Sequence, residues 1–356
     1  MNLPNQIFSG SFHGGHVQGI AVDSLRGFVY YSFTTVLIKT DLQGRLLGSV
    51  TNLIGHLGCI TLDAERNLLY GSLEYKHDAI GQGISKSLGI DLSYDEGFYL
   101  VCFDLEKIDR EHMNAEQDGV MKAVYLRTVL EDYLATDEVS GKPHRYGCAG
   151  VDGTALGPVF GAEPTSPKKI MVACGIYRDT ERQDNDHQLI LQYDRSIFDE
   201  FGQPLIQSAP HHSGPATCEQ RYFFYTGNTT YGVQNLEYDP HSRNWAVAVY
   251  VGTKECYTNF PLFMIDGSIA PKHTKLIGRN GEEGLRLSCA RVGELGKDGE
   301  IYGSHFPYGD TGIAALGDGT FYFSHHGRNK EEKTYCTTLV RYRYCPENPM
   351  LFEPIE

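Results

Sequence analysis

The chain has little basic charge and no segment of the kind that inserts into a membrane. It carries 31 Lys and Arg against 45 Asp and Glu in 356 residues, a formal net charge of −14. That balance disfavours nucleic acid as a partner, because a nucleic-acid site needs a basic surface. No run of about 18 apolar residues occurs, and residues 1–15 lack the basic and apolar regions of a signal peptide. We therefore expect no nucleic-acid partner, no membrane partner, and a binding pocket with local basic character if the substrate is acidic.

Paired metal-binding cysteines and the common enzyme motifs are also missing. The nine cysteines form no CxxC pair, and most lie in apolar runs, as Cys59 and Cys102 do. This pattern favours reduced, buried thiols and a cytosolic location. There is no HExxH, no GxSxG, no P-loop and no GxGxxG between a strand and a helix. The sequence thus gives no support to a zincin, an α/β-hydrolase or a nucleotide-binding protein.

An internal repeat is present instead. The segment HVQGIAVDSLRGFVYYSF (16–33) aligns without a gap with HLGCITLDAERNLLYGSL (56–73). The first copy continues through VLIKTD, a turn at Gly44 and RLLGSV, which together predict four strands. Weaker copies begin at 146–153, 231–250 and 310–325. Short strands recurring with turn signals predict an all-β fold, namely a β-propeller of four-stranded blades, of which five can be counted.

The remaining strands and the closure of the ring follow from the same pattern. The last copy lacks a fourth strand, and QIFSGSF near the N-terminus can supply it, which would join the chain ends in one propeller domain over 1–356. The rival interpretation is a β-sandwich or two β-rich domains. Long loops are expected at 76–97, 107–143, 178–186 and 279–308. Third and fourth strands are predicted at LVCFDL and KAVYLRTV, QLILQYD and RYFFYTG, FPLFMIDG and TKLIGR, and TTLVRYRY.

Repeat register also predicts where a site lies. The first strand of each propeller blade lines the channel, so the residues before it share one face with the loops that join second and third strands. His, Tyr and Arg side chains from several blades would converge there, as a concave site requires, although each could instead cap a turn or pack the rim. The residues before first strands are His13, His16, His56, His144, Arg145, Tyr146, Tyr231, Tyr308 and Asp310. The loops add Tyr75, Lys76, His77, Tyr177, Arg178, Arg182, His187, Lys254, Cys256, Tyr257, His325, His326 and Arg328.

Some of these histidines could bind a metal ion. His13 and His16 are separated by two residues, and His325 and His326 are adjacent. Because His is a usual ligand of zinc and manganese, a divalent Zn or Mn ion held by these four residues is one hypothesis. The spacing does not define the geometry of such a site, and the oligomeric state is not indicated.

The predicted set of side chains suits β-elimination from a uronic acid. A base removes the weakly acidic proton beside the carboxylate, an acid protonates the leaving oxygen, and an Arg or a metal neutralises the carboxylate. Glycoside hydrolysis would instead need two facing carboxylates. The predicted rim has few acids, with Asp186 and Asp310 the main candidates.

The run GHLGCITLDAERNLLYGSLEYKHDAIGQGI (55–84), with the repeat before it, resembles the β-propeller polysaccharide lyases, most nearly the ulvan lyases. The resemblance implies seven blades and a pair of catalytic histidines assisted by Tyr and Arg. His56 and His77 match that pair in spacing and context. Repeat register adds the other residues: Tyr146 and Tyr231 as catalytic partners, and Arg145, Arg178, His16 and Tyr177 as substrate-binding residues.

Three hypotheses follow, all with an acidic oligosaccharide or a protein bound at the same rim. The first is a cytosolic lyase that cleaves uronate-containing oligo- or polysaccharides. In it His56 acts as base or acid, and Arg178 holds the carboxylate. The second is a glycoside hydrolase or a metal-dependent hydrolase. The third is a non-catalytic propeller that binds sugar or protein, since a fold by itself does not establish a function.

Overall fold

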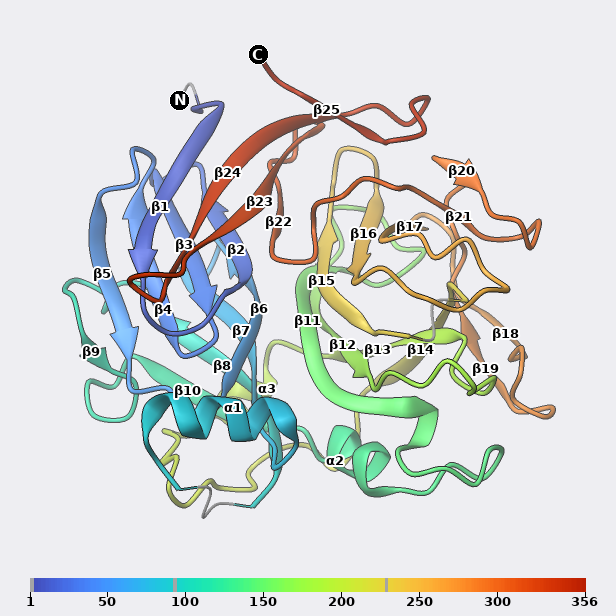
Figure 1. The fold of residues 1–356 in the computed structure, drawn as a ribbon, viewed down its shortest axis with the longest axis horizontal. Helices are drawn as coiled ribbons and strands as arrows, with labels where there is room; N and C mark the ends of the chain where they lie inside the picture. The colour runs from blue at the N-terminus through green and yellow to red at the C-terminus, as the bar shows by residue number, and fades with distance from the viewer. Residues whose placement is uncertain (1–2, 92–94, 228–229) are drawn as a thin grey trace.

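Five small β-sheets surround a central channel in the computed structural model, which describes residues 3–91, 95–227 and 230–356 (Figure 1). The first strand of each sheet contacts the first strands of the two neighbouring sheets, which closes a ring of five. The chain is therefore a five-bladed β-propeller. The count made from the repeats is confirmed, whereas the seven blades implied by the family resemblance are not formed. The five inner strands are β2 (Val17–Asp23), β6 (His56–Asp63), β11 (Cys148–Pro158), β15 (Val233–Tyr238) and β22 (Ile313–Ala315).

Blades 1 and 2 have the strands expected from the repeat. Blade 1 runs outward from β2 and carries a short parallel strand on its outer edge, and blade 2 runs outward from β6. The other strands of blade 1 are β3 (Phe28–Phe33), β4 (Val36–Asp41), β5 (Leu46–Thr51) and β9 (Met113–Asn114). Those of blade 2 are β7 (Leu68–Tyr75), β8 (Gly97–Asp104) and β10 (Met121–Tyr125).

Blade 3 contains one strand that was expected in blade 4. TKLIGR was expected as the fourth strand of blade 4, but its first residues lie in β18 (Lys272–Lys275). That strand pairs with β19 (Glu283–Arg286), which pairs in parallel with β14 (Gln220–Tyr225). Three of the four residues of β18 are exposed, which suits an outer edge and not a strand packed between blades. The remaining strands of blade 3 are β12 (Lys168–Ile176) and β13 (His187–Tyr193).

Blade 4 is a three-stranded sheet in which β15 is followed by β16 (Asn244–Val249) and β17 (Leu262–Asp266). Single bridges, Leu262 to Ser304 and Ile265 to Cys289, stand where a fourth strand would lie. The nearby pair β20 (Glu294–Leu295) and β21 (Tyr302–Gly303) forms a small separate sheet. The repeat is therefore least regular in this blade.

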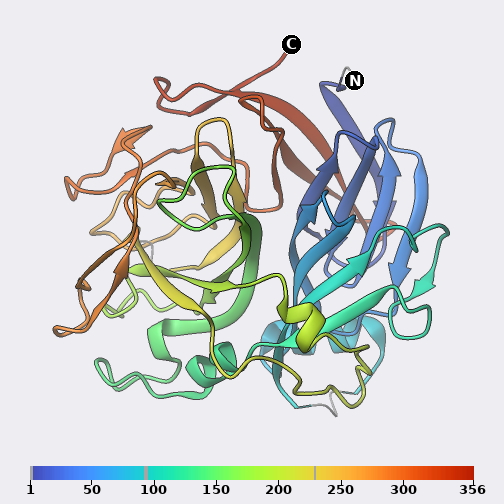
Figure 2. The same ribbon diagram turned by 180° about the vertical axis from the view of Figure 1, so that it is seen from behind.

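Blade 5 brings the two ends of the chain together. Its strands β22, β23 (Thr320–Asn329) and β24 (Thr334–Tyr344) are completed by β1 (Gln6–Phe12), which pairs antiparallel with β24. A short strand, β25 (Phe352–Pro354), also pairs with β24. β1 and β24 lie side by side in both views of the ribbon (Figures 1 and 2). This pairing covers strand edges that would otherwise be open to other chains.

The core lies between neighbouring blades. Leu37 and Val50 of blade 1 pack in one cluster with Leu57 and Leu73 of blade 2, all fully buried. Each such side chain contributes roughly 1.5–3 kcal/mol of transfer free energy. Close approach of the inner strands needs small residues, because a Cβ built on Gly19 in β2 would lie 2.8 Å from backbone atoms of β6. The ring of inner strands is therefore tightly packed.

Helices are short and lie in the loops. α2 (Arg127–Leu134) lies within the segment 107–143 that was expected to be a loop. α1 (Ala79–Leu88) likewise forms within the expected loop 76–97. Asp78 caps α1 by accepting from two backbone N–H groups, and Gly89 ends it in the left-handed conformation. A third, one-turn helix is α3 (Ile197–Glu200). Within the described residues, no helix has the length and apolar character required to cross a bilayer.

Candidate functional site

A cavity of about 630 Å³ lies at the end of the channel where the inner strands begin. All five blades supply residues to its wall, from His16 in blade 1 to Tyr335 in blade 5. It lies on the face that repeat register indicated. Of the residues that were assigned a catalytic or binding role from the sequence, five line it, namely His16, His56, Tyr177, Arg178 and Tyr231.

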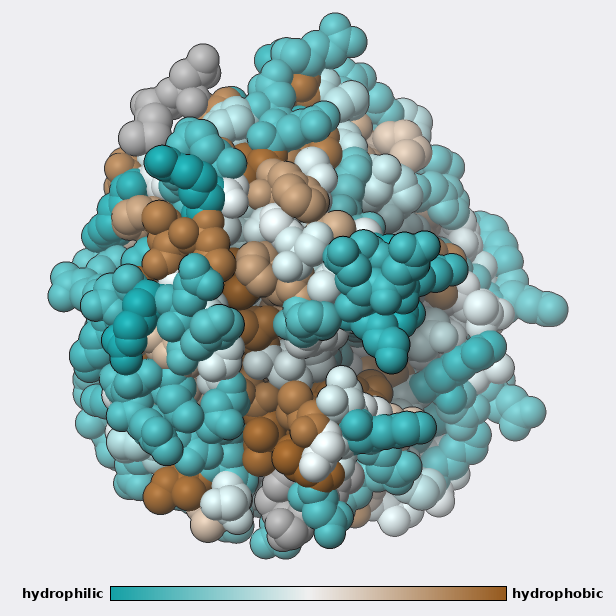
Figure 3. All heavy atoms as spheres, turned by 60° about the vertical axis from the view of Figure 1, so that its left-hand side comes forward, coloured by the Kyte–Doolittle hydropathy of each residue, from teal (hydrophilic) through white to brown (hydrophobic). Residues whose placement is uncertain are grey.

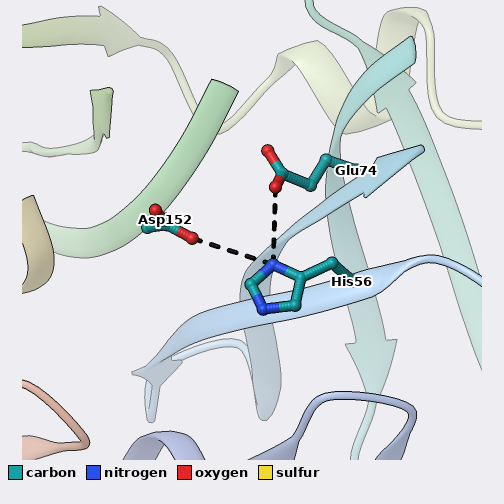
Figure 4. A group of neighbouring side chains, drawn as sticks. All are labelled: His56, Glu74 and Asp152. Atoms are coloured by element: carbon teal, nitrogen blue, oxygen red, sulfur yellow. Dashed lines mark ion pairs between the residues drawn. The ribbon is translucent and has the colours of Figure 1, made fainter. Parts of the chain in front are cut away.

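His56 is the first residue of β6 and lies beside two carboxylates (Figure 4). Its Nδ1 is 3.5 Å from Oε1 of Glu74 and 3.8 Å from Oδ1 of Asp152. Figure 4 shows that the other ring nitrogen, Nε2, lies on the opposite side of the ring from both acids. Carboxylates beside one nitrogen of a histidine favour a proton there and leave the other nitrogen able to accept one.

Glu74 is held by a buried ion pair. Oε1 of Glu74 lies 2.5 Å from Nζ of Lys76, and Oε2 accepts a hydrogen bond from the backbone N–H of Val151 at 3.0 Å. Lys76 also donates to the carbonyl of Ala149 at 2.8 Å. Burial acts to raise the pKa of Glu74, but the Lys76 charge and the neighbouring His56 together outweigh it, and the pKa falls below its usual range. Glu74 is therefore an anion at neutral pH, and Lys76 is its fixed cation.

Asp152 approaches His56 from blade 3. Its strand, β11, has irregular register at two places, between Cys148 and Gly150 and between Val151 and Gly153, and such bulges re-aim side chains. Burial, followed by the charge of Glu74, raises the pKa of Asp152 to about 6. This carboxyl can therefore exchange a proton near neutral pH.

A glycine two residues before Asp152 makes room for the acid from blade 2. Gly150 has φ +117°, and a Cβ built on it would lie 2.1 Å from Oε2 of Glu74. A side chain at this position would displace Glu74 and strain the backbone. The local sequence Gly150-Val151-Asp152 thus positions both acids.

Asp78 and Tyr177 form a third polar group at the rim. The hydroxyl of Tyr177 donates to Oδ2 of Asp78 at 2.7 Å, and Lys76 lies 3.6 Å from the same oxygen. Burial, with the hydrogen bonds to Tyr133 and Asp78, raises the pKa of Tyr177 well above its usual range. Tyr177 therefore keeps its proton and is not a base in this arrangement.

His16 occupies the corresponding position in blade 1 but has uncharged neighbours. Nε2 of Gln18 lies 3.1 Å from its Nε2, and the hydroxyl of Tyr250 lies 3.5 Å from the same atom. Burial, then the nearby His56 and His326, lowers the pKa of His16 to about 4. The ring of Tyr231 packs edge-on against that of Tyr250, with 5.8 Å between centroids. This side of the cavity is polar and neutral at pH 7.

Arg178 supplies positive charge that is not already paired. It is exposed at the cavity wall and makes no ion pair with a carboxylate in the part of the chain that the structure describes. Its guanidinium can therefore bind an incoming carboxylate in a bidentate manner.

His77 is not among the residues that line the cavity. Lys76 occupies the buried position after β7, and the chain then turns into α1, so His77 lies on the exposed side. Its backbone N–H donates to Glu96 and its carbonyl accepts from Gln82. The pairing of His56 with His77 that the resemblance implies is not seen in this arrangement.

Tyr146 and Arg145 lie elsewhere. A single 3-10 turn, Arg145–Gly147, precedes β11 and turns both side chains toward a separate cavity of about 500 Å³. The Tyr146 hydroxyl donates to Glu282 at 2.6 Å, and Arg145 pairs with Asp132 at 3.2 Å. Positive φ at His144 (65°) and Tyr146 (56°) turns this segment away from the channel, and this is the physical reason that register failed here.

The four histidines proposed as metal ligands are not assembled. His13 and His326 are exposed, while His325 stacks on Tyr308 with 3.6 Å between ring centroids. In the described part of the chain, the ligand atoms that lie within 4.8 Å of one another are those of His56, Glu74 and Asp152.

One nitrogen and two carboxylate oxygens are ligand atoms that a divalent ion accepts, but the ammonium group of Lys76 already neutralises Glu74. Lys76 touches the Glu74 oxygen that a metal would share. A cation in this cluster would therefore have to compete with Lys76, and the residues fit a lysine-neutralised site better than a metal site.

The rim was expected to be poor in acids, but it holds more of them than the sequence indicated. Glu74, Asp78 and Asp152 all lie at or beside the cavity. The sequence contained a signal for Glu74. The repeat aligns Glu74 with Thr34, and a charged residue is unusual at a buried position where the other copy of the repeat has an uncharged one. No comparable signal marked Asp152, since a bulge brings it in.

Comparisons with known proteins add little to this description. No family model matches the sequence, and no curated protein matches it. Among solved structures, the chain is similar to the holo form of the pyranose dehydrogenase PQQ domain from Coprinopsis cinerea, at 10% identity over 90% of this chain and 81% of that chain, with a TM-score of 0.38. It is also similar to a native arabinanase of Bacillus subtilis, at 9% identity over 95% of this chain and 97% of that chain, with a TM-score of 0.42. Neither is an ulvan lyase, and likeness at this level carries no inference about activity.

Proposed function

We propose that the chain is a carbohydrate-active enzyme that cleaves uronate-containing oligosaccharides by β-elimination, with His56 as the base. The observation that carries this proposal is His56 itself. Its Nδ1 lies between two carboxylates, in a cavity that also holds the unpaired cation Arg178 and the hydroxyl of Tyr231. A histidine oriented by carboxylates in this way is a suitable general base.

In the proposed reaction Arg178 binds the uronate carboxylate and His56 Nε2 removes the proton at C5. The electron pair of that C–H bond forms the C4–C5 double bond, the C4–O bond breaks, and the leaving oxygen takes a proton. No water and no oxidant is consumed. Glu74 and Asp152 stabilise the imidazolium that forms, while Arg178 stabilises the negative charge that develops on the carboxylate.

Tyr231 is the candidate acid for the leaving oxygen. It lies in the cavity wall contributed by blade 4, across the channel from blade 2, and packs against Tyr250. A hydroxyl on that side can reach a sugar oxygen while His56 works from the other.

Hydrolysis is the second candidate function, and one observation favours it. Asp152, with its pKa raised to about 6, has the character of a general acid, and Glu74 stays ionised nearby. Two carboxyl groups with separated pKa values are the usual requirement for glycoside hydrolysis. Glu74 is buried and paired with Lys76, however, so a substrate would reach Asp152 more readily than Glu74.

Ultraviolet absorbance separates these functions. Uronate-containing oligosaccharides, including ulvan and pectin fragments, are incubated with the protein, with and without Mn²⁺ or Zn²⁺. Elimination gives absorbance from the unsaturated uronate together with new reducing ends. Hydrolysis gives reducing ends alone. Absence of both products, with ligand binding shown by calorimetry, would overturn the enzymatic proposal in favour of a binding propeller.

A cytosolic location is part of the proposal. All nine cysteines are free thiols, and three of the five buried ones, Cys59, Cys148 and Cys174, lie in inner or second strands, which suits a reducing compartment. A cytosolic lyase would act on imported oligosaccharides. Fractionation of cells that produce the protein tests this, and recovery outside the cytoplasm would contradict it.

A further inference from the structure

One wall of the cavity is apolar, and this wall is built by α1. Ile80 and Ile84 line the cavity from consecutive turns of the helix, and Ile80 is 49% exposed. Gly83 lies beside them, and a Cβ built on it would meet no atom within 4 Å. In Figure 3, brown apolar surface gathers low on the face, at the height of α1, within a mostly teal surround. Apolar surface is thus available beside the charged groups of the site.

The helix is held rigidly against the charged wall. Asp78 caps its N-terminus and also accepts the Tyr177 hydroxyl from blade 3. At Gly81 the helix packs directly on the backbone of Lys76, because a Cβ there would lie 1.7 Å from the Lys76 carbonyl oxygen. The apolar wall is therefore a fixed part of the site.

Charge in the cavity is sufficient for one carboxylate and not for several. Among the lining residues that the structure describes, Lys76 and Arg178 carry fixed positive charge, and Lys76 is already paired with Glu74. Asp78 and Asp152 add negative charge to the same wall. A second carboxylate on the ligand would lie against these acids or against the isoleucines, without a cation, and would pay the cost of desolvation.

We propose that the cavity selects a uronate whose neighbouring sugar is uncharged and places its apolar face on Ile80 and Ile84, and that it discriminates against consecutive uronates. This inference rests on the proposed function, because it deepens the substrate class of the same site. It makes α1 a specificity element that blade 1 does not have.

The test uses two disaccharides of equal length, one with a neutral hexose on O4 of the uronate and one with a second uronate there. The wild-type protein is expected to favour the mixed disaccharide by about tenfold or more in kcat/KM, since each tenfold needs only about 1.4 kcal/mol. Ile80→Lys adds a cation to the wall and is expected to reduce that preference about tenfold. Leu88→Lys is the matched control, because Leu88 is on α1 and 40% exposed but does not line the cavity.

Binding of the same disaccharides, measured by calorimetry, distinguishes failure of the proposed elimination reaction from failure of the proposed selectivity. If neither disaccharide is turned over but the mixed one binds more tightly and Ile80→Lys removes the difference, elimination is wrong and the selectivity stands. A wild-type preference for the di-uronate, or equal effects of Ile80→Lys and Leu88→Lys, overturns the selectivity whatever the chemistry.

Discussion

Blades 1 and 2 are copies of one repeat, yet their first histidines have different surroundings. His16 and His56 occupy the same position, and the facing residues are Thr34 and Glu74. His16 therefore has uncharged polar neighbours and a pKa lowered to about 4, whereas His56 lies beside Glu74 and Asp152. The comparison teaches that a repeat fixes where a side chain lies, while residues on the adjacent strand and blade determine its chemistry.

The two blades also differ in how their second and third strands are joined. In blade 1 two residues separate β3 from β4, but in blade 2 the segment 76–96, with α1, separates β7 from β8. The longer connection places Lys76, Asp78 and the apolar face of α1 at the cavity. An insertion in one copy of the repeat thus builds most of one wall of the site.

The largest expected effect on activity comes from replacing His56, and the matching replacement of His16 serves as its comparison. His56→Asn is expected to lower kcat/KM on a uronate oligosaccharide by about 10²–10⁴-fold, because a general base is removed. His16→Asn, at the matching position, is expected to lower it less than about tenfold. Steady-state kinetics measures both, with circular dichroism to show that the fold is kept. Equal losses in the two variants would refute the assignment of the base to blade 2.

The second prediction concerns the buried pair that blade 1 lacks. Lys76→Met leaves the Glu74 carboxylate buried without its cation and is expected to cost about 3–5 kcal/mol of unfolding free energy. The double variant Glu74→Thr with Lys76→Met places in blade 2 the threonine that blade 1 has at this position, Thr34. Its unfolding free energy is expected to lie within about 1 kcal/mol of the wild-type value. Urea unfolding measures both variants. A double variant no more stable than Lys76→Met would show that the ion pair is not the cause.

The third prediction is that His16 and Asp152 give opposite dependence of stability on pH. The pKa of His16 is lowered from 6.5 to about 4, so its contribution is present above pH 6.5 and lost as pH falls through about 4. The pKa of Asp152 is raised from 3.8 to about 6, so its contribution is present below pH 3.8 and lost as pH rises through about 6.

Urea unfolding of the two single variants across this pH range measures these contributions. His16→Asn is expected to remove a rise in stability with pH, and Asp152→Asn to remove a fall, each of about 1–3 kcal/mol. If both substitutions change the slope of unfolding free energy against pH in the same direction, the proposed difference between the surroundings of His16 and His56 is wrong.

The smallest expected effect is on α1 itself. Gly83→Ala is expected to raise the unfolding free energy by about 0.5–1 kcal/mol, because alanine has the higher helix propensity and its Cβ meets no atom. Gly81→Ala is the contrasting variant and is expected to be destabilising, since its Cβ would clash with the Lys76 carbonyl. Thermal unfolding separates the two, and stabilisation by both would mean that α1 is not packed on Lys76.

Most of the fold was predictable because its signals are local. The strands of blades 1 to 3, the count of five blades and the strands of blade 5 follow from alternating apolar residues between turns. The assignment of TKLIGR failed, since outer-edge pairing of β18 depends on the distant strands β19 and β14. The helix α1 was missed because a short segment with two glycines has weak helical propensity, and its capping by Asp78 and packing on Lys76 stabilise it.

The site was predictable in part for the same reason. His16, His56, Tyr177, Arg178 and Tyr231 were placed on one rim by register, and the structure brings them to one cavity. Register failed for Tyr146 and Arg145, because the 3-10 turn before β11 directs them to a separate cavity.

The sequence by itself determined the repeat, the five blades and the face on which polar side chains gather, because strand periodicity and turn residues act over a few positions. Tertiary structure alone decided that Glu74 of blade 2 and Asp152 of blade 3 meet beside His56. It also decided that Lys76 neutralises Glu74 and that α1 supplies an apolar wall. These groups are distant in the chain, and burial between blades makes their mutual charges strong enough to set protonation.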